Sequence, residues 1–178
     1  MIVVSGVPVI KSRQNIHYKQ WQRYVDHPED HSCPWIPTEG WKLVRDLCSQ
    51  RPIELLLFSN PEDPRLEVLL ARSRRRFCVS EQLLNKLSSV ECSQGVVAFF
   101  PKPTWNWENL TSRVLYLDRL QDPGNLGTLL RTAQATGMFS LVTCPKTVSF
   151  FNSKVIRASS GSLFSVPFLE NISILKLK

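Results

Sequence analysis

The chain has 178 residues, of which 43% are hydrophobic and 21% are charged, and its formal net charge is +7. This composition is that of a globular protein, and it excludes disordered, collagen-like and coiled-coil chains. The excess of Lys and Arg favours a polyanionic partner such as nucleic acid, with a basic surface that has no partner as the alternative.

The sequence argues against a membrane span, a secretory signal and a metal site. No apolar run approaches the roughly 20 residues that a membrane helix needs. Residues 1–10 contain Pro8 and lack a basic start, unlike a secretory signal. The five cysteines are widely spaced without a CxxC pair, which predicts free thiols in a reducing compartment and no zinc ligands. We therefore expect a protein of the cytoplasm, or of an organelle, without membrane or metal.

The first hundred residues alternate between helical and strand patterns. We predict a helix over 11–24, a proline-rich loop over 26–37, and a helix over 38–50 that Thr38 caps. The patterns further along predict strands over 53–58, 77–79 and 95–100, and helices over 66–71 and 80–87. Residues 101–109 hold two prolines and two tryptophans and are typical of a linker.

The alternation starts afresh after this linker. The elements predicted there are a strand over 114–117, a glycine turn over 122–127, a helix over 126–136, a strand over 141–143, a helix over 152–158 and a strand over 166–169. Asn125 is the candidate cap of the first of these helices, and Gly137 ends it. Strands that alternate with helices predict a parallel sheet covered on both faces.

The strand, turn and helix over residues 117–137 form the most informative stretch. Gly124 and Gly127 allow a close backbone approach, and a helix N-terminus offers free N–H groups to an anion. No GxxxxGK[ST] or GxGxxG pattern occurs, which disfavours nucleotide binding of those kinds. Asn125 and Arg131 lie about 240° apart on a helix, so both line one cleft only if Asn125 sits in the turn. The residues alone leave a functional turn and a structural one open.

The run Asp122-Pro-Gly-Asn-Leu-Gly-Thr-Leu-Leu-Arg-Thr-Ala resembles the first signature of the SpoU/TrmH group of RNA ribose 2′-O-methyltransferases. Residues 154–167 are similar to the segment that follows this signature, in which small residues after an Arg lead into a strand. Residues 12–15 and 37–40 resemble the N-terminal extension of the group more loosely. The resemblance therefore spans almost the whole chain.

The resemblance implies an α/β fold with two parts. These are a small N-terminal α/β RNA-binding domain over 1–103 and, after a linker over 104–112, an incomplete α/β-knot (SPOUT-type) methyltransferase domain over 113–178 with a parallel sheet. It also implies S-adenosylmethionine as methyl donor, rRNA or tRNA as substrate, and a homodimer in the full-length form. The group's second and third signatures, which build the cofactor pocket, have no match here. We therefore expect this chain alone to bind the cofactor weakly and to leave apolar strand faces uncovered.

The resemblance assigns Asn125 and Arg131 to the site at the ribose. Because a guanidinium stays protonated, we expect Arg131 to orient the 2′-hydroxyl and stabilise developing negative charge rather than act as a base. The candidate RNA-binding cations are Arg13, Lys19, Arg72, Arg74, Arg75, Arg76 and Arg157. A solvated loop is the alternative for the cluster of four arginines over 72–76, and a contact with the partner subunit or a structural role is the alternative for Arg157. The predicted function is RNA 2′-O-ribose methylation, and the alternative is a non-catalytic RNA-binding remnant of the same family.

Overall fold

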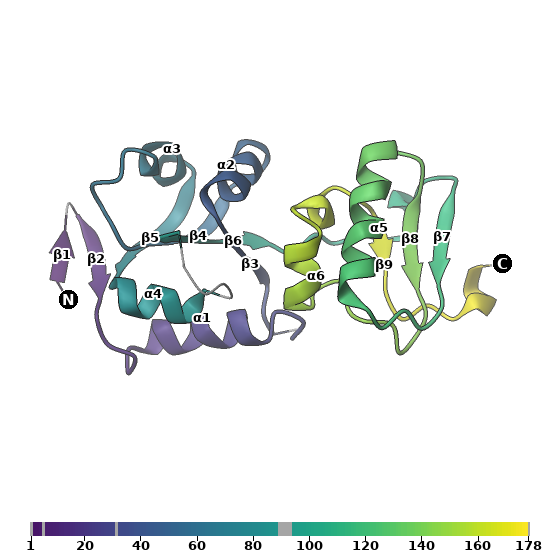
Figure 1. Ribbon diagram of the computed structural model, residues 1–178, viewed down its shortest axis with the longest axis horizontal. Coiled ribbons are helices and arrows are strands. Elements are labelled where there is room, and N and C mark those ends of the chain that lie inside the picture. The colour runs from purple at the N-terminus through teal and green to yellow at the C-terminus, as the bar shows by residue number, and fades with distance from the viewer. Residues whose placement is uncertain (1, 5, 31, 89–93, 178) are drawn as a thin grey trace. The chain divides into compact units, whose positions relative to one another are not determined.

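The computed structural model describes residues 2–4, 6–30, 32–88 and 94–177 (Figure 1). The chain divides into two compact units, Met1–Pro101 and Lys102–Lys178. Each unit has its own sheet. This division places the predicted linker residues 104–112 in the second unit, where a short 3-10 helix, η1 (Trp107–Asn109), forms.

The first unit is a six-stranded sheet in the order β1-β2-β5-β4-β6-β3, with helices on both faces. Its elements are β1 (Ile2–Val4), β2 (Val7–Ile10), α1 (Ile16–Asp26), β3 (Trp35–Glu39), α2 (Trp41–Gln50), β4 (Ile53–Phe58), α3 (Leu66–Ala71), β5 (Ser73–Val79), α4 (Glu81–Leu87) and β6 (Val96–Pro101). The neighbours β2, β5 and β4 are parallel, whereas β6 runs antiparallel to β4 and β3.

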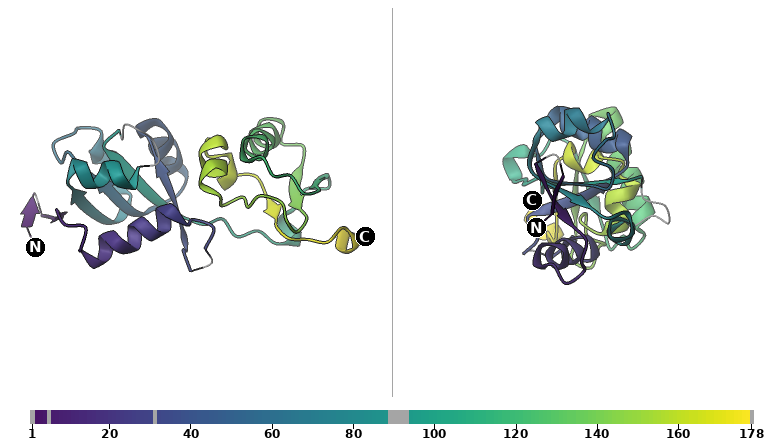
Figure 2. Two further views of the ribbon diagram at one scale, coloured as in Figure 1. Left: turned by 60° about the horizontal axis from the view of Figure 1, so that its bottom comes forward. Right: turned by 90° about the vertical axis from the view of Figure 1, so that its left-hand side faces the viewer.

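The core on one face of this sheet lies under α1 and α4, which are side by side in Figures 1 and 2. Its buried side chains are Ile10, Tyr18, Trp21, Tyr24, Cys33, Leu55, Leu57, Val79, Leu83, Leu84, Leu87, Val97 and Phe99. The Tyr18 hydroxyl donates to the Leu83 carbonyl at 3.1 Å, which joins the two helices within the apolar layer. The helices α2 and α3 cover the opposite face.

The segment before α2 differs from its predicted structure. Residues Trp35–Glu39 form β3 at the sheet edge, where Ile36 and Thr38 point inward in a period of two. Thr38 therefore does not cap a helix. The helix α2 begins at Trp41, whose backbone N–H donates to the Gln94 side chain at 3.1 Å. A residue distant in sequence thus replaces the local cap that the sequence suggested.

The loop after α1 contains Asp30, and the pKa of this carboxyl group tests the hydrogen bonds that the loop forms. Asp30 accepts from the Ser32 backbone N–H at 2.8 Å and from the Arg23 guanidinium at 2.7 Å. These bonds, the Ser32 backbone bond first, lower the pKa of Asp30 from 3.8 to about 2. Because the folded pKa lies below the unfolded value, this contribution to stability is present above pH 4 and is lost as the pH falls towards 2.

We expect an NMR titration of the Asp30 carboxyl to give a midpoint of about 2. Arg23→Gln removes one donor and should raise that midpoint. A wild-type midpoint near 3.8 would show that the loop contacts do not form in solution.

The second unit is a three-stranded parallel sheet in the order β7-β8-β9, as expected for its fold class. Its further elements are β7 (Val114–Leu117), α5 (Pro123–Thr136), β8 (Ser140–Thr143), α6 (Ser153–Ala158), η2 (Ser162–Phe164), β9 (Phe168–Leu169) and η3 (Ile174–Leu177). Gly137 ends α5 with φ 61°, the left-handed conformation that glycine adopts at helix ends. The prediction that Gly137 ends this helix is confirmed.

The expectation of uncovered strand faces is right for only one strand. All four residues of β8, the central strand of this sheet, are buried, so the prediction is wrong there. The strand β7 has one neighbour, and its Val114 is 39% exposed. Of the cysteines, Cys33, Cys48, Cys78 and Cys144 are buried, and Cys92 lies outside the described residues.

In the part of the chain that the structure describes, no helix is long and apolar enough to span a membrane. No group of three or more His, Cys, Asp or Glu side chains suited to a metal ion occurs among those same residues.

Candidate functional site

The N-terminal turn of α5 is held by Asp122. Its carboxylate accepts from the Asn125 backbone N–H at 2.6 Å, and Pro123 occupies the first helical position, where no N–H is needed. The expectation that Asn125 caps this helix is wrong, because the helix starts three residues earlier than predicted. Asn125 lies in the first helical turn with its side chain exposed.

Arg131 lies two turns further along α5 and is anchored by neutral groups. Its Nη1 donates to the carbonyl of Ala158, the last residue of α6, and its Nη2 donates to the Thr128 hydroxyl at 3.0 Å. The carbonyl end of a helix carries partial negative charge, which favours a cation there. Arg131 forms no ion pair with any residue that the structure describes, so no carboxylate neutralises its charge. The side chain is exposed.

Gly127 explains why α6 comes within reach of Arg131. A Cβ built on Gly127 would lie 2.4 Å from the Ala158 Cβ and 2.8 Å from the Ala158 carbonyl carbon. The two helices, which lie side by side in Figures 1 and 2, therefore approach as closely as they do because this position has no side chain. Gly127 and Arg131 are four residues apart and share one helix face. The glycine that sequence reasoning assigned to the turn thus serves helix packing.

The structure brings some of the predicted site residues together and separates others. Arg157 is exposed in the last turn of α6, next to the carbonyl that Arg131 contacts. Since Asn125 belongs to the same helix as Arg131, the two lie on different faces of α5. Thr128 was missed by sequence reasoning, although its position three residues before Arg131 is the spacing of helical neighbours.

A second connection ties α5 to the segment after α6. The Ser162 hydroxyl donates to the Gln134 side chain at 2.7 Å, and Ser162 is buried. Gln134 lies one turn after Arg131 on α5. The neighbourhood of Arg131 is therefore fixed on both sides by contacts within the second unit.

The carboxyl ends of β7 and β8 carry a second polar group of side chains. The Cys144 thiol donates to the Asp118 carboxylate at 3.2 Å, and the Arg119 backbone N–H donates to the Cys144 sulfur at 3.0 Å. The hydrogen bond from Cys144, followed by that from Arg119, lowers the pKa of Asp118. Ligands of open α/β sheets bind outside this end of the strands. In this chain, Asp118, Arg119 and Cys144 at this end of the strands hydrogen-bond to one another.

The basic residues of the first unit lie on different elements and have different contacts. Arg13 is exposed before α1, and Lys19 is exposed within it. The three arginines 74–76 lie within β5 rather than before it, because β5 begins at Ser73. Arg75 stacks on the Trp35 ring at 4.5 Å.

Their neighbours along β5 contact different partners. Arg74 pairs with Glu54 at 3.1 Å, and Arg76 donates to the Leu70 carbonyl at 3.3 Å. Alternate residues of a strand point to opposite faces, so Arg75 lies on the other face of the sheet from these two. The predicted compact cluster is therefore wrong as one surface.

The family model described as "SpoU rRNA Methylase family" matches residues 112–176. The 23S rRNA (guanosine(2553)-2′-O)-methyltransferase RlmP of Bacillus subtilis is 30% identical over 165 residues, which cover 90% of this chain and 64% of RlmP. The chain thus spans less than two thirds of the length of this curated relative.

Solved structures agree over both units. An rRNA methyltransferase from Sinorhizobium meliloti has a TM-score of 0.77 at 25% identity, covering 96% of this chain and 67% of that protein. The SpoU methyltransferase AviRb from Streptomyces viridochromogenes, in complex with the cofactor AdoMet, also has a TM-score of 0.77 at 25% identity, covering 92% of this chain and 66% of that protein. With the signature at the start of α5 and the parallel sheet around it, these similarities show that the chain belongs to the SpoU/TrmH family.

Proposed function

We propose that this chain acts in the 2′-O-methylation of ribose in ribosomal RNA, with Arg131 at the sugar, whereas Asn125, on another face of α5, is given no contact with it. The observation that carries the proposal is the state of Arg131, an exposed cation held by a backbone carbonyl and a hydroxyl. The similarity to RlmP supports the substrate class.

A fixed positive charge beside the sugar hydroxyl would favour methyl transfer to it. A ribose 2′-hydroxyl is a poor nucleophile, and negative charge develops on its oxygen as it attacks the methyl group. A preorganised guanidinium stabilises that charge without having to reorganise, and it also orients the hydroxyl by hydrogen bonding. Thr128 and the Ala158 carbonyl hold the guanidinium in place. Thr128 is thus a positioning residue in this proposal.

S-adenosylmethionine is the methyl donor that the proposal requires, by similarity to AviRb, whose structure contains AdoMet. The polar groups of this chain at the carboxyl ends of β7 and β8 contact one another in this structure. The Asp118 carboxylate and the Cys144 thiol bond to each other, and the Thr147 hydroxyl donates to the Leu117 carbonyl at 3.3 Å. No step is therefore assigned to these side chains.

A second candidate function is RNA binding without catalysis. The net charge of +7 and the exposed cations of both units support RNA binding in either case. A homodimer in the full-length form, and a place in the cytoplasm or in an organelle that contains ribosomes, are further parts of the proposal.

The test measures methyl transfer and RNA binding side by side. The chain is incubated with ribosomal RNA and methyl-labelled S-adenosylmethionine, and 2′-O-methylation is scored by resistance of the linkage to alkali. We expect Arg131→Ala to lower methyl transfer by about 100- to 1,000-fold, the range for losing one oxyanion donor. RNA affinity should change much less. Thr128→Val, which removes only the anchoring hydroxyl, should give an intermediate loss.

Thr132→Ala on the same helix is the matched control, since Thr132 donates only to the Thr128 backbone carbonyl. Methyl transfer that Arg131→Ala leaves unchanged would refute the role of the guanidinium. RNA binding without any transfer by the wild-type chain would select the non-catalytic function.

A further inference from the structure

The segment that follows α6 orients two side chains on the same side of α5. Arg131 donates to the carbonyl of Ala158, and the side-chain oxygen of Gln134 accepts from the Ser162 hydroxyl at 2.7 Å. Ala158 ends α6 and Ser162 begins η2, so both contacts come from the short stretch 158–162. Arg131 and Gln134 are three residues apart, a spacing that puts their Cβ atoms about 5–6 Å from each other. The two side chains therefore end in one neighbourhood.

A sharp bend after α6 brings Ser162 against α5. Ser160 and Gly161 have positive φ angles of 48° and 89°, which turn the backbone between α6 and η2. Ser162 is only 2% exposed, so its hydroxyl needs a partner within the protein. The partner is the Gln134 oxygen, and this bond fixes the orientation of the Gln134 amide.

The amide nitrogen of Gln134 is the group that this orientation leaves for a ligand. Gln134 is exposed, and its Nε2 donates to no group among the residues that the structure describes. An amide nitrogen carries two N–H donors and no acceptor. Recognition of adenine by glutamine uses the amide oxygen as well as the nitrogen, and here the oxygen is engaged by Ser162. The free nitrogen therefore fits a ligand group that only accepts hydrogen bonds.

A phosphate oxygen beside the reacting sugar is such a group. Phosphate oxygens of nucleic acids accept from glutamine side chains among others. In an RNA strand the 2′-hydroxyl and the 3′-phosphate are attached to adjacent carbons of the ribose, whatever the base. A nucleotide whose 2′-hydroxyl contacts Arg131 thus has its 3′-phosphate within the neighbourhood that Arg131 and Gln134 share.

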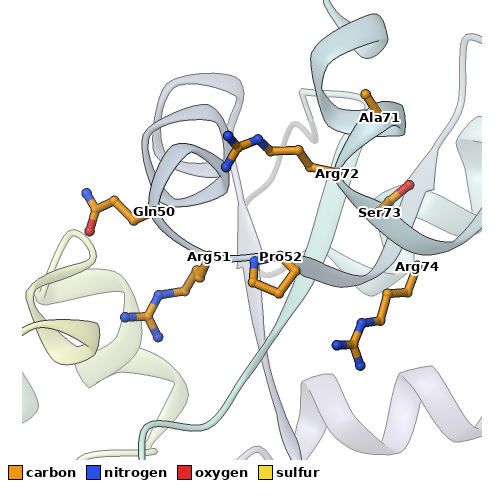
Figure 3. A pocket seen from close by; sticks show the side chains of 7 residues that line it. All are labelled: Gln50, Arg51, Pro52, Ala71, Arg72, Ser73 and Arg74. Atoms are coloured by element: carbon orange, nitrogen blue, oxygen red, sulfur yellow. The ribbon is translucent and has the colours of Figure 1, made fainter.

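The donors of the pocket in the first unit are arranged differently. This pocket of about 400 Å³ lies at the N-terminal ends of β4 and β5, and the side chains of its three arginines, Arg51, Arg72 and Arg74, point in different directions (Figure 3). Arg131 and Gln134, in contrast, are both oriented by one segment.

We propose that Gln134 donates from Nε2 to an oxygen of the 3′-phosphate of the nucleotide that is methylated, with Ser162 as the residue that positions it. The inference rests on the proposed function, because it takes Arg131 to lie at the 2′-hydroxyl. The phosphate is present before and during the reaction, so the contact strengthens substrate binding and lowers KM without changing kcat. Arg131, in contrast, acts on charge that develops only as the 2′-oxygen attacks.

The first arm of the test is steady-state methyl transfer by the full chain to ribosomal RNA, with KM for RNA and kcat determined separately. Gln134→Ala should raise KM about 10-fold, the loss expected for one hydrogen bond to a charged group. Gln134→Glu keeps an oxygen for the Ser162 hydroxyl but replaces the donor with a negative charge, so it should raise KM further. Ser162→Ala leaves the amide free to rotate and should give a smaller rise.

Thr132→Glu is the matched control, because it introduces the same negative charge on another face of α5, about 200° from Gln134 around the helix. Its KM should stay close to that of the wild type. The thermal unfolding of each variant shows whether it is folded. A wild-type KM in both Gln134→Ala and Gln134→Glu would overturn the inference and leave the proposed function standing.

The second arm does not depend on methyl transfer. It follows the NMR signals of the Gln134 side-chain amide and the Arg131 Nε–H while a nucleotide is added. We expect guanosine 3′-monophosphate to shift both signals, and 2′-deoxyguanosine 3′-monophosphate to shift that of Gln134 only. Guanosine 5′-monophosphate should leave the Gln134 signal unshifted.

The two arms separate failure of the inference from failure of the proposed function. In a chain that transfers no methyl group, a Gln134 signal shifted by the two 3′-monophosphates alone would support the phosphate contact and refute the methyl-transfer function. A Gln134 signal that neither 3′-monophosphate shifts would overturn the inference, whether or not the chain transfers methyl groups.

Discussion

Replacing Gly127 with alanine is expected to destabilise the second unit by about 1–3 kcal/mol, the usual cost of forcing an extra carbon into a packed contact. The new Cβ would lie 2.8 Å from the backbone carbonyl carbon of Ala158, which cannot rotate away. The better helix propensity of alanine, about 1 kcal/mol, offsets only part of this cost. Hydrogen exchange of the Leu130 and Leu141 amides, which are buried in α5 and β8, measures the loss in this unit alone.

Gly124→Ala is the matched control on the same helix. Its Cβ would meet only the Asp122 Oδ1, at 3.1 Å, the oxygen that caps α5, and this exposed side chain has to give way by only a few tenths of an ångström. We expect the exchange rates to change much less for this variant. Unaltered exchange in Gly127→Ala would mean that α5 and α6 do not pack as closely in solution as the structure has them.

Phe99→Ala is expected to cost the first unit about 3–5 kcal/mol, the range for removing a buried aromatic ring from a core. Phe99 is fully buried in β6, the strand between β4 and β3, and its neighbours in register are Leu55 and Pro37. Domains of this size have only about 5–15 kcal/mol of stability in total. Urea unfolding followed by circular dichroism, with the exchange of the Leu57 amide, should show a large part of that stability lost.

Ile16→Ala provides the comparison for this core variant, because Ile16 is 77% exposed at the start of α1. Surface substitutions of this kind change stability by less than about 0.5 kcal/mol. A loss below about 1 kcal/mol in Phe99→Ala would be inconsistent with a ring enclosed on all sides.

Long periodic segments with clear end signals could be predicted from the sequence. The strand over Ile53–Phe58 is observed with the predicted bounds, since an apolar run, interrupted here only by Glu54, is typical of a central strand. The helix α5 ends at the predicted Gly137. Its start was misplaced because Asp122 and Asn125 are both good capping residues, and the pattern of apolar residues begins only after them.

The strands at the sheet edges could not be predicted in this way. The strand β3 contains Pro37 and alternates only weakly, and such a strand is settled by pairing with β6, which is distant in sequence. At the candidate site, the fixed position of Arg131 depends on the approach of α6 to Gly127, which is a tertiary contact. The first signature of the family indicated Arg131 as a site residue, but it could not indicate the contact with α6 that fixes its side chain.

The half-paired state of β5 has a consequence for behaviour at high concentration. On the side of β2, the described residues pair with this strand at Cys78 and Val79 only, so among them no strand pairs with the stretch that carries Arg74, Arg75 and Arg76 on that side. An open edge can template the addition of a strand from another molecule, and a row of like charges along it repels an identical strand. We therefore expect that neutralising these three arginines promotes self-association through this edge.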